Sequence, residues 1–311
     1  MSVVERVAEQ AAGNPVVNKD DLPLLLVLPG LFVFLAFMLF PVLYLVYLSF
    51  TNAEPATLFQ GEEQWVGIAN YIRILSDGQF WNSMGVTWLF VATSVALKVL
   101  VGLAVGLVVT GKRVRGKRFM RALIIIPLGL PGIFTITIWR GIFSSAEFGL
   151  MNQFLRMANL SSVAWLSERW MAFLAYNVTE AWLAYPFMVI ITVSALQDVP
   201  EELHEAAMID GAGFFSRFLH VTLPSIKRPV LFASILTAAA SFQQFLIPYV
   251  FNQGGPSRTN ELLIVYGFRE AFRFQKYGEG AAIMIIAVLV IGAFMMLNVW
   301  KGRLAEGVED A

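Results

Sequence analysis

The sequence predicts an all-α integral membrane protein with six transmembrane helices and both termini in the cytoplasm. Of its 311 residues, 58% are hydrophobic and only 14% are charged, and the mean hydropathy is +0.68. A water-soluble domain cannot cover so much apolar surface with polar groups. The apolar residues also form blocks long enough to cross a hydrocarbon layer about 30 Å thick. The placement of Lys and Arg between these blocks supplies the orientation.

Six apolar blocks are the predicted spans, and they occupy residues 24–50, 83–111, 122–143, 171–196, 230–250 and 280–300. They define one membrane domain, 23–300, between cytoplasmic tails 1–22 and 301–311. Residues 1–21 are polar and of mixed charge, unlike a cleavable signal peptide, so we expect an uncleaved first helix. Proline at 29, 41, 127, 131, 186 and 248 should bend several helices. Gly102 and Gly106, one turn apart in the second block, should allow a neighbouring helix to approach closely.

The distribution of basic residues orients the spans. The segment between the second and third blocks holds the densest basic cluster, whereas the loop after the first block has only Arg73. Cytoplasmic loops carry the excess of Lys and Arg, so this segment and both termini should be cytoplasmic. The cluster comprises Lys112, Arg113, Arg115, Lys117, Arg118 and Arg121. The outer segment after the fifth block agrees less well, since it carries Arg258, Arg269, Arg273 and Lys276.

A polar segment, 197–228, separates the fourth and fifth blocks. Asp198 followed by Pro200 and Glu201 predicts a helix start, with Asp198 as the N-cap and Glu201 completing a capping box. The helix should cover 202–210 and end at Gly211, because glycine readily adopts the left-handed conformation that terminates helices. A second short helix is expected over 214–220.

The same segment carries a recognisable motif. Glu205-Ala206-Ala207, then Gly211, then 221–224 (Val-Thr-Leu-Pro) resemble the EAA signature of the permease subunits of ABC importers, with Val221 in place of the usual Ile. An interfacial amphipathic helix is the alternative explanation. Residues 66–71 and the Gly254-Gly255-Pro256 loop are similar to signatures of the carbohydrate branch of that family, although Asn252 stands where Thr is expected.

The resemblance implies a type I ABC importer permease fold in which 197–228 is the coupling loop that docks on an ATP-hydrolysing subunit. It assigns this contact to Glu205, Ala206, Ala207, Met208, Asp210, Gly211, Leu223 and Pro224. It assigns docking of an extracytoplasmic binding protein to Gly254, Gly255 and Pro256. The implied partners are a second homologous permease subunit, two ATP-binding subunits, the solute-binding protein and membrane lipid, with no nucleic acid. The implied location is the plasma membrane, and the implied cargo is a sugar or related polyol.

We do not expect this chain to catalyse a reaction or to bind a cofactor or metal. The sequence has no phosphate-binding P-loop, so ATP and Mg²⁺ should be bound by the partner subunits and no cofactor by this chain. It has no cysteine, and its two histidines, His204 and His220, lack companions that would make a metal site. No nucleophile and base occur together, so we do not expect an enzyme.

Transport of a sugar requires polar side chains that face a cavity, because an unpaired buried polar group costs free energy. In the fifth block, Ser234, Thr237, Ser241 and Gln244 share one helical face. The full set of predicted path residues is Asn177, Glu180, Trp182, Tyr185, Ser241, Phe242, Gln243, Gln244 and Tyr249.

Two questions stay open at the level of sequence. Glu180 either contacts cargo or forms an ion pair with Lys98 or Arg140, and we favour the ion pair because intramembrane charges are usually paired. Lys98 itself either pairs internally or lies at a subunit interface. The same architecture could import peptides or amino acids, and an ion-driven secondary transporter that uses Glu180 and Lys98 as a proton relay is a further alternative.

Overall fold

Residues 22–111 and 114–302 are described by a computed structural model, and in these ranges the chain is helical with no strand beyond a single bridge between Thr51 and Trp65. The predicted tails lie almost entirely outside the described residues, as do Lys112 and Arg113. The all-α class is therefore confirmed for the part of the chain that the structure describes.

Four continuous helical segments there are long and apolar enough to cross a membrane, and two bent helix pairs bring the total to six if each pair counts as one span. The first segment joins α2 (Leu22–Phe34), a π-helical turn (Leu35–Leu39) and α3 (Phe40–Ser49). The other three are α6 (Gly78–Thr110), α10 (Arg169–Gln197) and α16 (Tyr277–Gly302). The bent pairs are α7 (Lys117–Gly129) with α8 (Gly132–Ile142), and α13 (Leu223–Phe242) with α14 (Leu246–Asn252).

The bends follow the local sequence only in part. Leu130 is extended because the residue before a proline avoids the helical conformation, and α8 restarts after Pro131 at 98° to α7. The bend of 41° between α13 and α14 falls at 243–245, before Pro248. Pro186 lies inside α10 without ending it. The expected bend is thus confirmed for the third block, whereas α10 continues as a helix through Pro186 and the first span stays helical through Pro29 and Pro41.

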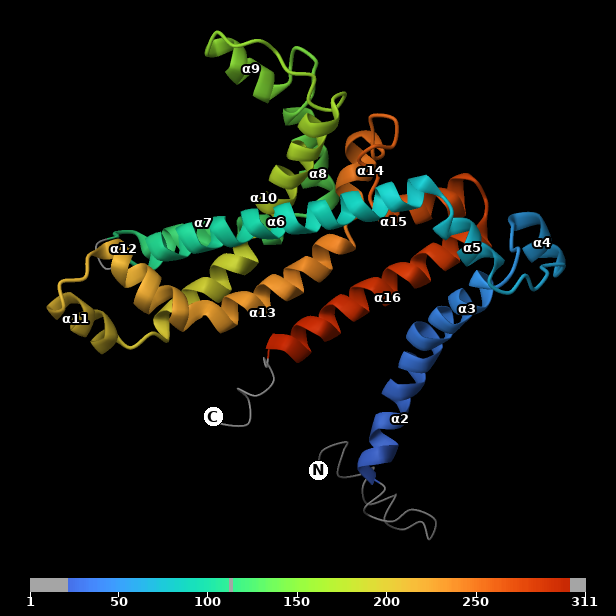
Figure 1. Cartoon of the computed structure of the whole chain (residues 1–311), viewed down its shortest axis with the longest axis horizontal. Helices are drawn as coiled ribbons and strands as arrows, with labels where there is room; N and C mark the ends of the chain where they lie inside the picture. The colour runs from blue at the N-terminus through green and yellow to red at the C-terminus, as the bar shows by residue number, and fades with distance from the viewer. Residues whose placement is uncertain (1–21, 112–113, 303–311) are drawn as a thin grey trace, which may run out of the picture.

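Close packing of α6 on α10 forms the centre of the bundle (Figure 1). A Cβ atom added at Gly102 would lie 2.9 Å from Cβ of Met188, and one added at Gly106 would lie 2.7 Å from Cγ2 of Thr192. The predicted close approach at the glycine pair is confirmed, and Met188 and Thr192 of α10 are the residues that make it.

Short helices gather at the end of the bundle that we call the distal end, opposite residues 197–228. They are α4 (Pro55–Gln60), α5 (Ala69–Leu75) and α15 (Leu263–Phe268), which continues into a π-helical turn (Arg269–Arg273). The short helix α9 (Leu150–Met157) lies apart from these, beyond α8 (Figure 1). Asn70, within the 66–71 signature, is buried and donates hydrogen bonds to the carbonyls of Ser49 (2.9 Å) and Thr51 (2.8 Å). This part of the signature anchors the end of the first span.

The first span leaves the bundle as a separate arm (Figure 1). Between Leu26 and Tyr47 no side chain is buried. Only the end of α3 is attached, through a small core that includes Leu48, Ala53 and Ala281 and through the hydrogen bonds from Asn70. The arm therefore presents apolar side chains on all its faces, as a helix surrounded by lipid or by another subunit does.

Candidate coupling hairpin and intramembrane polar network

The polar segment folds into a helical hairpin at the end of the bundle (Figure 1). It consists of α11 (Glu201–Ile209) and α12 (Phe214–Arg217), and α12 runs through a π-helical turn (Phe218–Thr222) into α13 without interruption. The predicted N-cap is wrong: Asp198 ends α10, its N–H bonds the carbonyl of Ser194, and Pro200 precedes α11 with no side-chain cap. The backbone of Asp198 is still helical, so its side chain cannot begin the next helix.

Gly211 ends α11 in the predicted way. Its φ angle is +81°, in the left-handed region that side chains with a Cβ disfavour. The N–H of Gly211 bonds the carbonyl of Met208 (3.0 Å), and the N–H of Ala212 bonds that of Ala207 (2.8 Å). These two bonds make a Schellman motif, which sets the angle between the arms of the hairpin.

The hairpin exposes an apolar tip together with acidic side chains, among them Glu205 and Asp210. Met208, Ile209, Phe214 and Phe215 are all exposed, Phe215 by 78%. Glu205 is also exposed and forms no ion pair or side-chain hydrogen bond with any described residue. Exposed apolar groups of this size, together with an unpaired charge, are typical of a surface that contacts another protein.

The remaining residues assigned to this contact lie at different depths. Ala206 and Asp210 are exposed on α11, and Ala207 is half-buried. Leu223 and Pro224 form the first turn of α13, where Leu223 is half-buried and Pro224 exposed. The structure therefore places the whole predicted set on or beside one hairpin, and its role in coupling remains a prediction.

A buried polar network links α6, α10 and α13. Lys98 has an exposed fraction of 0%, and its Nζ lies 2.6 Å from Oε1 of Glu180, 2.7 Å from Oγ of Ser241 and 3.3 Å from Oγ1 of Thr237. The ammonium thus has an acceptor for each of its three protons. Among the alternatives left open above, the structure pairs Glu180 with Lys98.

The carboxylate of Glu180 is equally well satisfied. Its Oε1 accepts from Lys98 and lies 3.2 Å from Oγ of Ser241, and its Oε2 accepts a hydrogen bond of 2.6 Å from Nε2 of Gln244. Buried charges are tolerated only with such compensation, because removing them from water costs several kcal/mol per ion. The predicted polar stripe of the fifth block therefore binds α13 to its neighbours through Thr237, Ser241 and Gln244, whereas Ser234 bonds the carbonyl of Val230 in its own helix.

The predicted path residues separate into enclosed and accessible groups. Ser241 and Phe242 are buried between neighbouring helices, and Phe242 packs against Trp88. In contrast to the prediction, these two side chains do not line open space. Asn177 is buried as well and accepts a bond from Thr93 (2.8 Å). Packing of α6 against α10 and α13 covers these positions, which periodicity within one helix cannot reveal. The predicted path residues that remain accessible are Trp182, Tyr185, Gln243, Gln244 and Tyr249.

The Gly254-Gly255-Pro256 loop is held tightly at the distal end. Gly254 is buried with φ +78°, and a Cβ there would lie 2.7 Å from Cα of Glu261. Asn260 closes the loop by donating to the carbonyls of Arg169 (2.6 Å) and Gly255 (3.2 Å). Gly255 and Pro256 are half-buried. Any docking role must use these two residues rather than Gly254.

A cluster of ion pairs at the distal end was not predicted. Glu261 is buried and pairs with Arg258 (2.8 Å) and Arg269 (2.6 Å), and Glu279 pairs with Arg73 and with Lys276 (3.3 Å). Of the four basic residues that agree less well with the orientation, Arg258, Arg269 and Lys276 are thus paired with acids locally, and Arg273 donates a hydrogen bond to Gln253. The sequence could have predicted this pairing, since the acidic residues Glu261, Glu270 and Glu279 lie in the same segment as these basic residues.

Burial also perturbs titration in this cluster. It raises the pKa of Glu270 above the ordinary 4.5, against the opposing effect of Lys276 and Arg258. Burial likewise raises the pKa of Tyr266, whose hydroxyl donates to Oδ2 of Asp77 (2.6 Å). In the described part of the chain no group of three or more His, Cys, Asp or Glu side chains is arranged to hold a metal ion.

Comparison with known proteins is consistent with this architecture. Residues 98–300 match the family described as "Binding-protein-dependent transport system inner membrane component". The trehalose/maltose transport system permease protein MalF of Thermococcus litoralis is 33% identical over 90% of this chain and 92% of its own. The diacetylchitobiose uptake system permease protein DasB of Streptomyces coelicolor is 34% identical over 86% and 83%, respectively.

Among solved structures, a chain of a bacterial alginate ABC transporter in complex with its pentasaccharide-bound periplasmic protein superposes with a TM-score of 0.73. It covers 92% of this chain and 95% of its own at 18% identity, which supports the shared fold. The chain therefore belongs to the family of binding-protein-dependent transport system inner membrane components, and it is a multi-pass permease subunit of the inner membrane.

Proposed function

We propose that this permease subunit imports a sugar or related polyol in an ATP-driven ABC importer. An extracytoplasmic binding protein delivers the cargo at the distal end, and two ATP-binding subunits act at the hairpin. The relatives named for trehalose/maltose and for diacetylchitobiose support a carbohydrate cargo. The chain supplies transport rather than catalysis, and ATP with Mg²⁺ is bound by the partners. The sequence, which has no P-loop, supports this division of labour.

The observation that carries the proposal is the exposed hairpin. Met208, Phe214 and Phe215 offer apolar contact area, and unpaired Glu205 offers a charge for a basic group on the ATP-binding subunit. The continuous path from α12 through the π-helical turn into α13 gives a displaced hairpin a direct mechanical connection to the membrane core. Closure of the two ATP-binding subunits on ATP would move the hairpin and, with it, α13. This movement would change the side of the membrane to which the transport cavity is open.

A second permease subunit completes the pathway in this proposal. The arm formed by α2 and α3 exposes apolar side chains around its circumference, which supports its packing against such a subunit. The proposed cargo contacts are accessible polar and aromatic residues. They are Gln243 and Gln244 at the bend between α13 and α14, Tyr249 in α14, and Trp182 and Tyr185 of α10. Aromatic rings and amides of this kind match the apolar faces and hydroxyls of a sugar.

The test is to separate ATP hydrolysis from uptake in the complete transporter. Glu205→Lys and Gly211→Pro should abolish binding-protein-stimulated uptake while the chain still reaches the membrane in normal amounts. Glu62→Lys, an equivalent charge reversal at an exposed site of the distal end, is the control and should transport normally. Normal uptake by both hairpin variants would disprove the coupling role.

Two alternatives are distinguished by other measurements. A ligand screen on the cognate binding protein separates sugar from peptide or amino-acid cargo. A secondary transporter would continue to transport after ATP depletion and stop with an uncoupler. The saturated hydrogen bonding of Lys98 and Glu180 argues against a proton relay through this pair, since each group lacks a free partner for transfer.

A further inference from the structure

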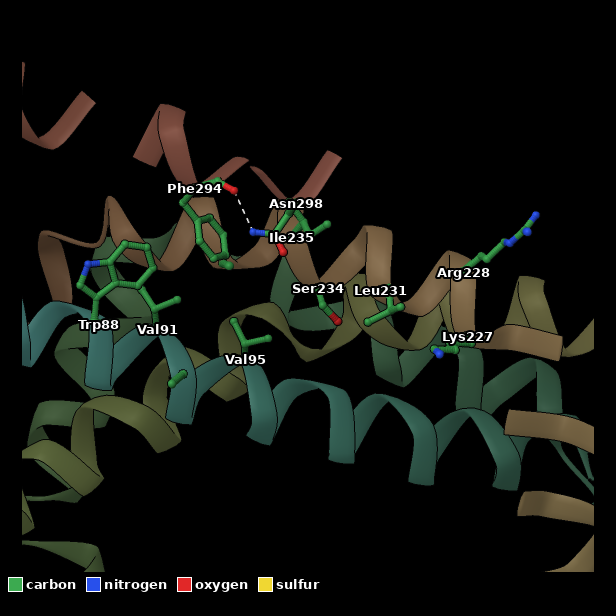
Figure 2. Close-up of a pocket in the computed structure, with 12 residues that line it drawn as sticks. Trp88, Val91, Val95, Lys227, Arg228, Leu231, Ser234, Ile235, Phe294 and Asn298 are labelled. Carbon is green, nitrogen blue, oxygen red and sulfur yellow. Dashed lines mark hydrogen bonds between the residues drawn. The ribbon is translucent and has the colours of Figure 1, made fainter. Parts of the chain in front are cut away.

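A groove of about 680 Å³ lies between α6, α13 and α16, away from the hairpin tip and the polar network (Figure 2). Its walls are mainly apolar, with Val91 and Val95 from α6, Leu231 and Ile235 from α13, and Phe294 from α16. Lys227 and Arg228 stand at one end, and the ring of Trp88 lies at the other, packed against Phe242 and Phe294.

The polar groups of the groove differ in whether they already have a hydrogen-bond or ion-pair partner. Ser234 donates to the carbonyl of Val230, and Asn298 donates to that of Phe294. Lys227 and Arg228 are exposed and have no carboxylate partner among the described residues. An anionic group at the end where Lys227 and Arg228 lie would therefore complement the charge of the groove.

The length of the groove matches one leaflet. Arg228 and Ala238 both line it, and ten residues of helix span about 15 Å. Half of a hydrocarbon core of roughly 30 Å is the same length. The two cations lie toward the hairpin end of α13, so in the proposed orientation they lie at the cytoplasmic interface, where anionic lipids attract basic residues.

From this arrangement we propose that the groove binds an anionic phospholipid of the cytoplasmic leaflet. Lys227 and Arg228 hold the headgroup phosphate, and one acyl chain lies along Leu231, Ile235 and Val95 and ends against Trp88. A spanning helix, such as the 22–49 arm of a second permease copy, is the competing occupant. Such a helix is 10–12 Å across and would have to continue past Trp88 and Phe294, where the groove ends.

The experiment measures lipid retained by the purified transporter complex in native mass spectrometry, with phosphatidylglycerol and phosphatidylcholine of equal chain length as probes. Wild type should retain phosphatidylglycerol in preference to phosphatidylcholine. The double variant Lys227→Gln/Arg228→Gln should bind phosphatidylglycerol about 25-fold more weakly, since each cation contributes roughly a fivefold gain in affinity for an anionic lipid. Ala92→Trp, which fills the groove without changing charge, should also lose the lipid.

The matched control is Arg115→Gln/Arg118→Gln, which removes the same charge from exposed positions at the same end but outside the groove. It should retain wild-type binding. Equal loss in this control, or equal retention of both lipids by wild type, would overturn the proposal. A photo-reactive side chain at position 235 supplies an independent result: capture of lipid supports the site, and capture of a permease helix rejects it. Melting temperatures confirm that each variant is folded.

Discussion

Lys98 and Glu180 form an ion pair of 2.6 Å between α6 and α10 in which neither side chain is exposed by more than 6%. The pair is 82 residues apart in sequence and shares Ser241 of α13 as a third member. Three helices are therefore held in register by one network at their common interface.

Removing one partner of this pair should be much worse than removing both. Lys98→Met leaves a buried carboxylate without its counter-charge and should destabilise the chain by about 3–5 kcal/mol. The double variant Lys98→Met/Glu180→Leu should recover most of that loss, because two apolar groups of similar size leave no charge uncompensated. Melting temperatures in detergent, arranged as a double-mutant cycle, measure the effect. Additive losses would contradict the pairing.

The close contact of α6 with α10 makes a second prediction. Gly102→Val should destabilise the bundle by about 1–3 kcal/mol, because its side chain would overlap Met188 and the helices cannot separate without losing contacts elsewhere. Gly85→Val is the control in the same helix, since no atom lies within 4 Å of a Cβ at Gly85. Thermal unfolding should separate the two variants clearly. Similar losses would show that helix propensity, not packing, is responsible.

The exposed tip of the hairpin should affect assembly without affecting folding. Phe215→Ser removes a ring that is 78% exposed, so the melting temperature of the isolated chain should hardly change. Affinity for the ATP-binding subunits should fall by about tenfold, as for other aromatic residues at the centre of interfaces. Phe59→Ser, at an even more exposed ring of the distal end, should leave that affinity intact. Unchanged binding of Phe215→Ser would remove this residue from the interface.

Glu270 should make the distal end sensitive to pH. Its pKa is raised by burial, so the stability contributed by its neutral form is fully present below its ordinary pKa of 4.5 and is lost as pH rises through the raised pKa. Glu270→Gln keeps a neutral side chain at every pH, so wild type should become less stable relative to this variant over that range. Melting temperatures from pH 4 upward provide the measurement, and a constant difference between the two proteins would contradict it.

The sequence alone determined which segments enter the membrane and which segment forms the hairpin, because both are local properties. Apolar blocks of sufficient length predict spans, and Gly211 can end a helix with φ +81° wherever that helix lies. Capping was less predictable. Aspartate is a favoured N-cap residue, but Asp198 ends α10, where its backbone N–H bonds the carbonyl of Ser194, so it does not begin α11.

Tertiary structure alone decided which side chains the spans bring together. The face shared by Thr237, Ser241 and Gln244 could be read from periodicity, yet whether it met cargo or a buried lysine depended on α6, which lies about 140 residues earlier in the chain. The same is true of Glu261 and its arginines, and of the groove ending at Trp88. These contacts depend on how rigid helices cross and bend, and no single segment of sequence contains that information.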